Sequence, residues 1–155
     1  MTYQVNEEYR ERVPTATVRV RTTMERIPDD LGRIYQQVFS CLNESGAAPG
    51  GAPFARYHEM TETDIDMEAG VPVSPDVTGN EDVSASELPG GPVAVVWYEG
   101  PYGEEMGAAY AAIEQWMSEH QRTPAGGPWE VYWTDPDETS PEDYRTEIIW
   151  PLREA

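Results

Sequence analysis

Residues 93–117 read VAVVWYEGPYGEEMGAAYAAIEQWM, and residues 18–42, which lie 75 positions earlier, follow the same order as VRVRTTMERIPDDLGRIYQQVFSCL. Both stretches begin with alternating valines, pass a proline, and continue with apolar residues at helical spacing. Four apolar positions of the earlier helix segment recur in the later one: Leu31 at Met106, Tyr35 at Tyr110, Val38 at Ile113 and Leu42 at Met117. Each stretch is therefore predicted to form a strand followed by a helix.

The match extends outward on both sides of these stretches. At the same offset, three turn and strand positions recur: Gly51 at Gly126, Pro53 at Pro128 and Tyr57 at Tyr132. After a longer loop the offset becomes 79, where Glu68 matches Glu147 and Pro72 matches Pro151. Internal similarity of this kind predicts two copies of one supersecondary unit, at 5–73 and 80–152. The Pro/Gly-rich stretch 74–80 reads as a connection within one domain, so 1–155 is predicted to be a single domain.

Each copy reads as strand, strand, helix, strand, strand. Alternating and apolar runs predict strands in eight places: Gln4–Arg12, Thr17–Thr22, Phe54–Glu59, Ile65–Val73, Asp82–Leu88, Pro92–Glu99, Trp129–Thr134 and Tyr144–Leu152. Acids after Pro28 and Pro101 mark the starts of two helices, at Asp29–Asn43 and Glu104–His120. This pattern predicts an α+β fold, in which an antiparallel sheet carries two helices on one face about a pseudo-two-fold axis. A cleft is expected where the two copies meet.

Composition excludes several classes of protein. The formal charge is −19, and all ten bases are Arg, so the chain is not expected to bind DNA or RNA directly. The acidity is equally explained by solvation in a saline environment. Cys41 is the single cysteine, which excludes an internal disulfide. No apolar run could span a membrane and no secretory signal pattern is present, so a cytoplasmic location is expected. Metal-binding, P-loop and dinucleotide motifs are missing, so we predict neither metal nor cofactor.

The last strand of each copy carries the candidate acid. Alternation places Thr146 and Ile148 on the helix-packed face and Glu147 on the opposite face, as it does for Glu68 in the first copy. The second strand of the second copy is apolar on both faces, and its Val96 and Tyr98 are predicted to share the face of Glu147. A carboxylate among aromatic rings favours a flat, cationic ligand. The alternative is that Glu147 is solvated and Tyr98 packs in the core.

Several of these segments together resemble the DNA-gyrase-inhibitor-like (GyrI-like) effector-binding family. The resemblance is carried by Glu99-Gly100-Pro101-Tyr102-Gly103-Glu104, by Pro53 to His58 followed by Asp66 to Val73, and by the final Thr146-Glu147-Ile148 to Leu152. It covers essentially the whole chain. The resemblance implies a duplicated β-α-β-β (SHS2-like) module that binds lipophilic, often cationic, compounds, with Glu147 at the position of the family's acid. Relatives fused to a MerR- or AraC-type module contact DNA, and this chain is not expected to carry one.

Three functions follow from the resemblance. The first is capture of aromatic cations by a set of lining residues: Glu147, Tyr98, Tyr110, Tyr132, Trp133 and Val96. The second is hydrolysis of cyclopropane-bearing DNA-alkylating compounds, in which Glu147 is the catalytic residue. The third is modulation of DNA gyrase, or of a transcription regulator, through protein contact.

Overall fold

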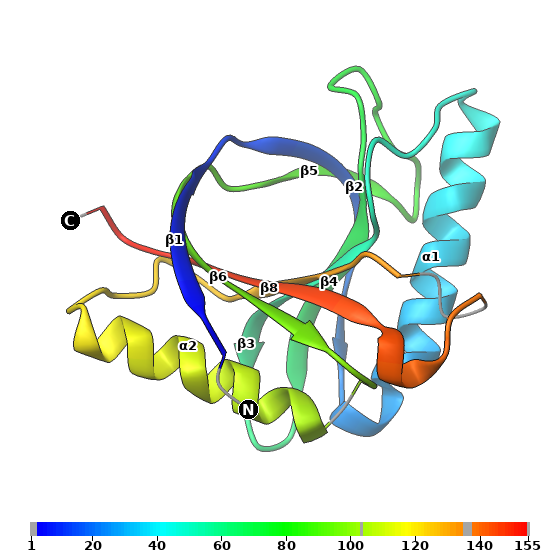
Figure 1. The fold of residues 1–155 in the computed structure, drawn as a ribbon. Helices are drawn as coiled ribbons and strands as arrows, with labels where there is room; N and C mark the ends of the chain where they lie inside the picture. Colours follow the sequence, from blue (N-terminus) through cyan, green and yellow to red (C-terminus); the bar gives the residue numbers. More distant parts are fainter. Residues whose placement is uncertain (1–2, 103, 135–137, 155) are drawn as a thin grey trace. The chain divides into compact units, whose positions relative to one another are not determined.

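The computed structural model describes residues 3–102, 104–134 and 138–154 and divides the chain into two compact units. Unit 1 contains Met1–Glu11 and Gly91–Ala155, and unit 2 contains Arg12–Gly90. Figure 1 labels both α-helices and the strands other than β7. The elements are β1 (Val5–Arg10), β2 (Val13–Thr22), η1 (Met24–Arg26), α1 (Ile27–Glu44), β3 (Phe54–Met60), β4 (Ile65–Pro72), β5 (Ser84–Leu88), β6 (Gly91–Glu99), η2 (Glu104–Met106), α2 (Gly107–Glu119), β7 (Trp129–Tyr132), η3 (Pro141–Asp143) and β8 (Arg145–Pro151). The predicted α+β class, with antiparallel strands and two helices, is confirmed.

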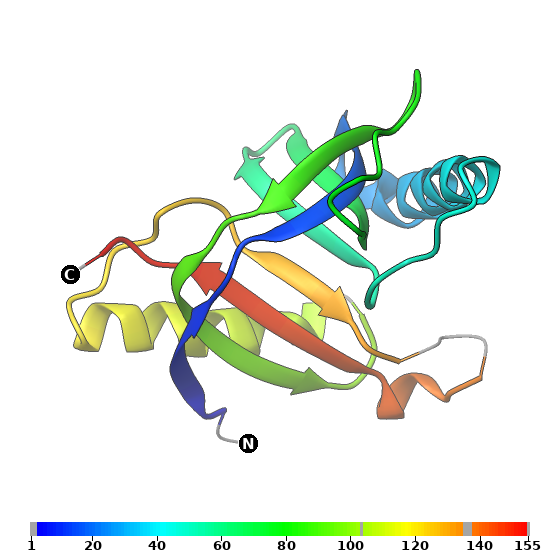
Figure 2. The same ribbon diagram turned by 90° about the horizontal axis from the view of Figure 1, so that it is seen from above.

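Unit 1 is built on four antiparallel strands in the order β1-β6-β8-β7. Figure 2 shows β8, in red, between β6 and β7, with α2 along one side of these strands. Unit 2 has the corresponding arrangement, because its strands are ordered β5-β2-β4-β3 and it carries α1. The two units therefore have the same strand order, in which β1, β6, β8 and β7 of unit 1 correspond to β5, β2, β4 and β3 of unit 2.

The first strand of each sequence half pairs with the second strand of the other half. β1 runs antiparallel to β6, with Val5 opposite Val96, and β5 runs antiparallel to β2, with Leu88 opposite Val13. The unit boundaries therefore fall after Glu11 and after Gly90. The stretch 74–80 lies inside unit 2. The equivalent strand orders agree with a duplication, which stays a prediction.

The helix ends follow local chemistry. Pro28 lies in the first turn of α1, where its missing N–H costs no hydrogen bond, and Asp29 and Asp30 follow it at the positive end of the helix dipole. Gly46, with φ of 71°, adopts the left-handed conformation just beyond the helix end. In unit 1 the predicted helix start is shortened, because Glu104–Met106 form a 3-10 turn before α2. Among the described residues, no helix is long and apolar enough to cross a membrane.

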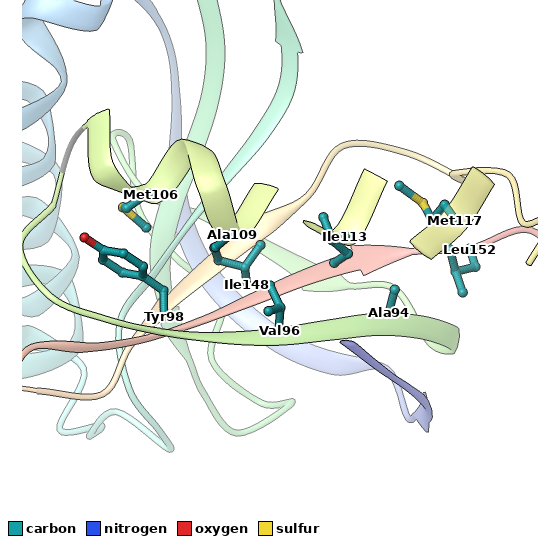
Figure 3. Packing of buried hydrophobic residues seen from close by; sticks show 9 residues of the cluster. All are labelled: Ala94, Val96, Tyr98, Met106, Ala109, Ile113, Met117, Ile148 and Leu152. Atoms are coloured by element: carbon teal, nitrogen blue, oxygen red, sulfur yellow. The ribbon is translucent and has the colours of Figure 1, made fainter. Parts of the chain in front are cut away.

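The core of unit 1 lies between α2 and the sheet. Figure 3 shows side chains of α2 meeting those of β6 and β8, with Ile113 fully buried between helix and sheet. The cluster consists of nine buried residues: Ala94, Val96, Tyr98, Met106, Ala109, Ile113, Met117, Ile148 and Leu152. Since Ala109, Ile113 and Met117 recur every four positions, one stripe of α2 supplies the helix side of the core.

Two strands of unit 2 approach each other unusually closely at a glycine. Gly70 of β4 faces Thr17 of β2 across the ladder, and a Cβ placed on Gly70 would lie 1.9 Å from the carbonyl oxygen of Ala16. Ala16 is itself fully buried. The backbone of β2 therefore occupies the space that any other residue at position 70 would need.

Candidate functional site

The strand pairings of unit 1 determine which side chains share a face. Residues directly opposite each other in an antiparallel ladder project to the same side. Val96 is paired with Ile148, and both belong to the cluster packed on α2. Trp97 is paired with Glu147, so these two side chains project to the other side, which we call the Glu147 face. The prediction that Glu147 points away from the helix-packed core is confirmed.

The assignment of Val96 and Tyr98 to the Glu147 face is wrong. Both are in the core under α2, and the Tyr98 hydroxyl donates to the Pro101 carbonyl at 2.6 Å. The cause is a register slip between the two second strands. The partners of Glu68 and Glu147 are Arg19 and Trp97, whose numbers differ by 78 rather than 75. A slip by an odd number of residues moves every side chain to the opposite face.

Glu147 is a buried carboxylate whose charge is already matched. It is 4% exposed and accepts a hydrogen bond from Arg10 Nη2 at 2.8 Å and one from Trp133 Nε1 at 3.1 Å. Trp133 lies beside Trp97, with ring centroids 6.4 Å apart, and the Arg145 guanidinium stands 4.8 Å from the Trp97 ring. The ion pair and the indole hydrogen bond together connect β1, β8 and the residue after β7.

We expect Arg10→Met to lower the free energy of unfolding by about 2 kcal/mol, because it leaves Glu147 buried without a cation. The value is below that of a fully buried pair, since Arg10 is 34% exposed and partly screened. The double variant Arg10→Met/Glu147→Gln should recover most of the loss. Urea unfolding of the wild type, both single variants and the double variant gives the coupling energy. Additive effects would show that the pair contributes nothing to stability.

A second buried carboxylate lies on the α2 face. Glu130 in β7 is paired with Ile148 of the core cluster, and it is 7% exposed. The Tyr110 hydroxyl, from α2, donates a short hydrogen bond to Glu130 Oε2. The Tyr132 hydroxyl, from the same strand, donates to Oε1 at 2.8 Å. Each carboxylate oxygen therefore accepts one tyrosine hydroxyl.

Burial dominates the electrostatics of Glu130. Loss of solvent raises the pKa of its carboxyl group, and the hydrogen bonds from Tyr110 and Tyr132 oppose that rise without cancelling it. Within the described part of the chain, no Arg or His forms an ion pair with Glu130. In contrast to Glu147, Glu130 has no cationic partner among the described residues.

Aromatic rings surround this carboxyl group. Tyr102 packs edge-on against Tyr132, with centroids 5.3 Å apart, and stacks on Tyr144 at 4.9 Å. Burial, Tyr144 and Glu130 together raise the pKa of Tyr102. Because Tyr102 is 42% exposed, the aromatic set reaches solvent at this ring. Tyr110, which is bonded to Glu130, packs edge-on against Trp150, with centroids 6.2 Å apart. We call these six residues the Glu130 cluster: Glu130, Tyr102, Tyr110, Tyr132, Tyr144 and Trp150.

The predicted lining residues divide among three environments. Tyr110 and Tyr132 belong to the Glu130 cluster, Trp133 accompanies Glu147, and Val96 and Tyr98 lie in the core. Sequence reasoning missed Glu130. The available signal was its alternation with Tyr132 in the segment Trp-Glu-Val-Tyr, which places both on one face of a strand.

Unit 2 differs from unit 1 at the position that corresponds to Glu130 and in the partners of its buried acid Glu68. Ala55 is fully buried where the repeat offset places Glu130 in the second half, so unit 2 has no acid there. One of its buried acids is Glu68, which accepts hydrogen bonds from Thr17 Oγ1 and from His58 Nε2, both at 2.7 Å. Burial raises the pKa of Glu68, but hydrogen bonds including those from Thr17, His58 and Ser86 leave it lowered. His58 lies at a bulge of β3, which turns its side chain toward Glu68.

Two hollows on the surface of unit 2 lie away from Glu68. One of about 550 Å³ is lined by residues around the end of α1, including Phe39 and Pro49, and one of about 470 Å³ by polar residues including Gln37 and Asp82. Neither includes a buried acid. Within the described residues, no group of three or more His, Cys, Asp or Glu side chains is placed to hold a metal ion. The Glu130 cluster differs from both hollows, because it combines a buried acid with an aromatic ring, Tyr102, that reaches solvent.

Comparison with known proteins agrees with a role in ligand binding. The family model of the GyrI-like small molecule binding domain matches residues 3–153. Among curated protein sequences, none matches the chain.

Solved structures share the fold at low sequence identity. The C-terminal domain of EcmrR is 21% identical, with a TM-score of 0.82 over the whole of both chains. A hydrolase from Listeria innocua is 14% identical, with a TM-score of 0.67 over 97% of this chain and 92% of its own. SAV2435, solved with bound tetraphenylphosphonium, is 16% identical, with a TM-score of 0.66 over 99% and 94%. At these identities the likeness establishes the fold.

Proposed function

We propose, from the premise that this chain belongs to the GyrI-like small molecule binding domain family, that it captures lipophilic aromatic cations at the Glu130 cluster. Small-molecule binding is the property of the family. The cationic and aromatic character of the ligand is our proposal, and the observation that carries it is the burial of the Glu130 carboxyl group without a cationic partner among the described residues. This carboxylate is buried among tyrosines, and the described residues supply it with no cation.

The chemistry of the cluster selects for such a ligand. A carboxylate removed from water gains more from a nearby cation than an exposed one does, because the local dielectric is low. The faces of Tyr102, Tyr132 and Tyr144 add attraction for a positive charge and a large contact area for aromatic groups. The net charge of −19 raises the local concentration of cations and repels anions.

Glu147 supports this assignment by contrast. The sequence predicts it as the ligand-binding acid, but Arg10 already supplies its counter-charge at 2.8 Å. A cationic ligand would have to displace that guanidinium and would gain only the difference between two similar interactions. Glu130 has no such competitor among the described residues. We therefore assign Glu130, rather than Glu147, as the acid that binds the cationic ligand.

The bound ligand of one structural neighbour supports the choice of probe. SAV2435 was solved with tetraphenylphosphonium, a permanent cation whose charge is covered by four phenyl groups. We expect this cation to bind the present protein saturably and to change its tryptophan fluorescence, because Trp150 contacts Tyr110 within the cluster. Tetraphenylborate is the matched control, since it has nearly the same shape and the opposite charge.

The fluorescence titration therefore uses both ions at the same concentrations. We expect affinity for tetraphenylphosphonium to exceed that for tetraphenylborate by at least about 100-fold, since the two charges interact with Glu130 with opposite signs. Equal affinity for the two ions would refute capture of cations. No saturable binding of either ion would refute the proposed site altogether.

Ring-opening hydrolysis is the alternative function, and the observation that favours it is the pair of groups at the cluster. A tyrosine hydroxyl bonded to a buried carboxylate can stabilise positive charge or direct a water molecule to an electrophile. A protein of this fold from Listeria innocua is described as a hydrolase. Mass spectrometry of a cyclopropane-bearing alkylator, incubated with and without the protein, separates turnover from binding. A rate equal to that of the protein-free control would exclude the alternative for that compound.

A further inference from the structure

We infer that the Glu130 cluster exchanges a proton for its ligand: Glu130 holds a proton in the empty site and releases it when a cation binds. The inference rests on the proposed function and adds its regulation. It makes the affinity for permanent cations depend on pH through a single carboxyl group. It also allows the same cluster to accept neutral aromatic compounds while Glu130 is protonated.

The geometry explains why the empty site favours the protonated form. Glu130 is 7% exposed, between the sheet of unit 1 and α2, so an ionised carboxylate there has lost most of its hydration. Its two hydrogen bonds come from neutral hydroxyl groups, Tyr110 on Oε2 and Tyr132 on Oε1. Neutral donors stabilise a carboxylate less than a guanidinium does. The part of the chain that the structure describes supplies no positive charge to compensate this burial, and the bound cation would supply it.

Among the described residues of unit 1, tyrosines donate the hydrogen bonds to Glu130, and further aromatic rings pack around these tyrosines. Tyr110 comes from α2, Tyr132 from β7, Tyr102 from the segment before η2 and Tyr144 from the segment before β8. On β6, Tyr98 lies on the same face. Burial, and after it the nearby acid Glu105 of η2, raise the pKa of the Tyr98 hydroxyl. Burial and the Tyr110 and Tyr132 hydrogen bonds are the causes that shift the pKa of Glu130. Within this set of described residues, Glu130 is the carboxyl group whose pKa these contacts shift.

The direction of the linkage follows from the raised pKa of the empty site. A bound cation stabilises the carboxylate, so the pKa of Glu130 is lower in the complex than in the free protein. Between these two pKa values, binding expels a proton. As the pH falls below the raised pKa, the cation must compete with an increasing proton occupancy, and its affinity declines. Well above that pKa, the site is already ionised and binding releases no proton.

The test is isothermal titration calorimetry with tetraphenylphosphonium, which has no titratable group of its own. Titrations at each pH use two buffers of different ionisation enthalpy, and the difference in observed enthalpy gives the number of protons released. We expect release to approach one proton per bound cation between the pKa of Glu130 in the complex and its raised pKa in the free protein, and to vanish well above the latter. Between these two pKa values the dissociation constant should rise by about tenfold for each unit of pH lowered.

Two variants assign the proton to Glu130. Glu130→Gln should bind more weakly, with no proton release and no pH dependence. Tyr110→Phe removes a hydrogen bond that stabilises the carboxylate, so it should move the pH midpoint upward while keeping the release. Glu68→Gln is the matched control, because it removes the charge of a comparably buried acid in unit 2 and should leave both properties unchanged. Circular dichroism checks that each variant is folded.

The possible failures are distinguishable. If the wild type binds the cation saturably but releases no proton at any pH, or if Glu130→Gln keeps the wild-type release, the proton exchange is refuted and cation capture stands. If the wild type shows no saturable binding over the whole range, the proposed function itself has failed.

Discussion

Glu130→Gln is expected to weaken binding of tetraphenylphosphonium by about 10- to 100-fold at pH values above the raised pKa of Glu130, which is the strength of a charge-assisted contact. Glutamine keeps the size of the side chain and can still accept a hydrogen bond from a tyrosine hydroxyl, so the aromatic contacts remain and the change isolates the charge. Binding of a neutral aromatic compound should change much less. A fluorescence titration of both proteins with both ligands measures the difference.

The same substitution should stabilise the free protein. The pKa of Glu130 is raised above its ordinary value of 4.5, so the folded state binds more protons than the unfolded state between the two values. Stability is therefore highest below the ordinary pKa and falls as pH rises through the folded pKa. Glutamine removes this loss, and the difference in melting temperature between variant and wild type should grow from acidic to neutral pH. A lower melting temperature for the variant at neutral pH would contradict the account of Glu130 as a destabilised charge.

Gly70→Ala is expected to lower the free energy of unfolding by about 3 kcal/mol, because the new methyl group would lie 1.9 Å from the backbone oxygen of Ala16. Relief requires movement of the β2 backbone, since the obstructing atoms belong to the main chain. For a chain of this length the change corresponds to a fall of roughly 10 °C in melting temperature. Thermal and urea unfolding measure it directly.

Gly32→Ala is the matched control for Gly70→Ala, and it is expected to change the free energy of unfolding in the opposite direction. Gly32 lies within α1, is exposed, and a methyl group placed on it would have no atom within 4 Å. Alanine there should stabilise the protein by about 0.5–1 kcal/mol, because glycine loses more backbone entropy in a helix. If both substitutions had the same sign, the close approach of β2 and β4 would not be the reason for Gly70.

The elements of the fold could be predicted from the sequence because their signals are local. The stripe Ala109, Ile113 and Met117 has the period of a helix, and Pro28 and Gly46 mark the two ends of α1. The helix offset of 75 also holds, since Ile34 and Val38 are buried like Ala109 and Ile113. Patterns of this kind need only a few neighbouring residues to be recognised.

The faces of the second strands could not be predicted in the same way. The segment Val93–Val96 is apolar at every position, so alternation does not distinguish its two sides. Only the partner strand fixes the assignment, through the pairing of Trp97 with Glu147. The offset of 75 holds for the helices, but the strand pairings give an offset of 78. The two offsets differ by three, and because three is odd, Val96 and Tyr98 project to the face opposite to the predicted one.

The importance of Glu130 could not be predicted for a related reason. Trp129 and Tyr132 put aromatic residues on both faces of β7, so alternation does not indicate which face α2 covers. The role of Glu147 depends on its counter-charge as well. Arg10 lies far from it in sequence, and nothing in the local pattern indicates that β1 pairs with β6.

That pairing constrains the order in which the protein can be assembled during synthesis. β1 leaves the ribosome first, yet its partner β6 begins at Gly91, after all of unit 2 has been made. Unit 2 can complete its sheet as soon as β5 emerges, whereas the earliest strand must wait with its edge unpaired until the later half of the chain appears. A nascent chain halted near Gly90 would therefore hold one finished unit and a free strand ahead of it.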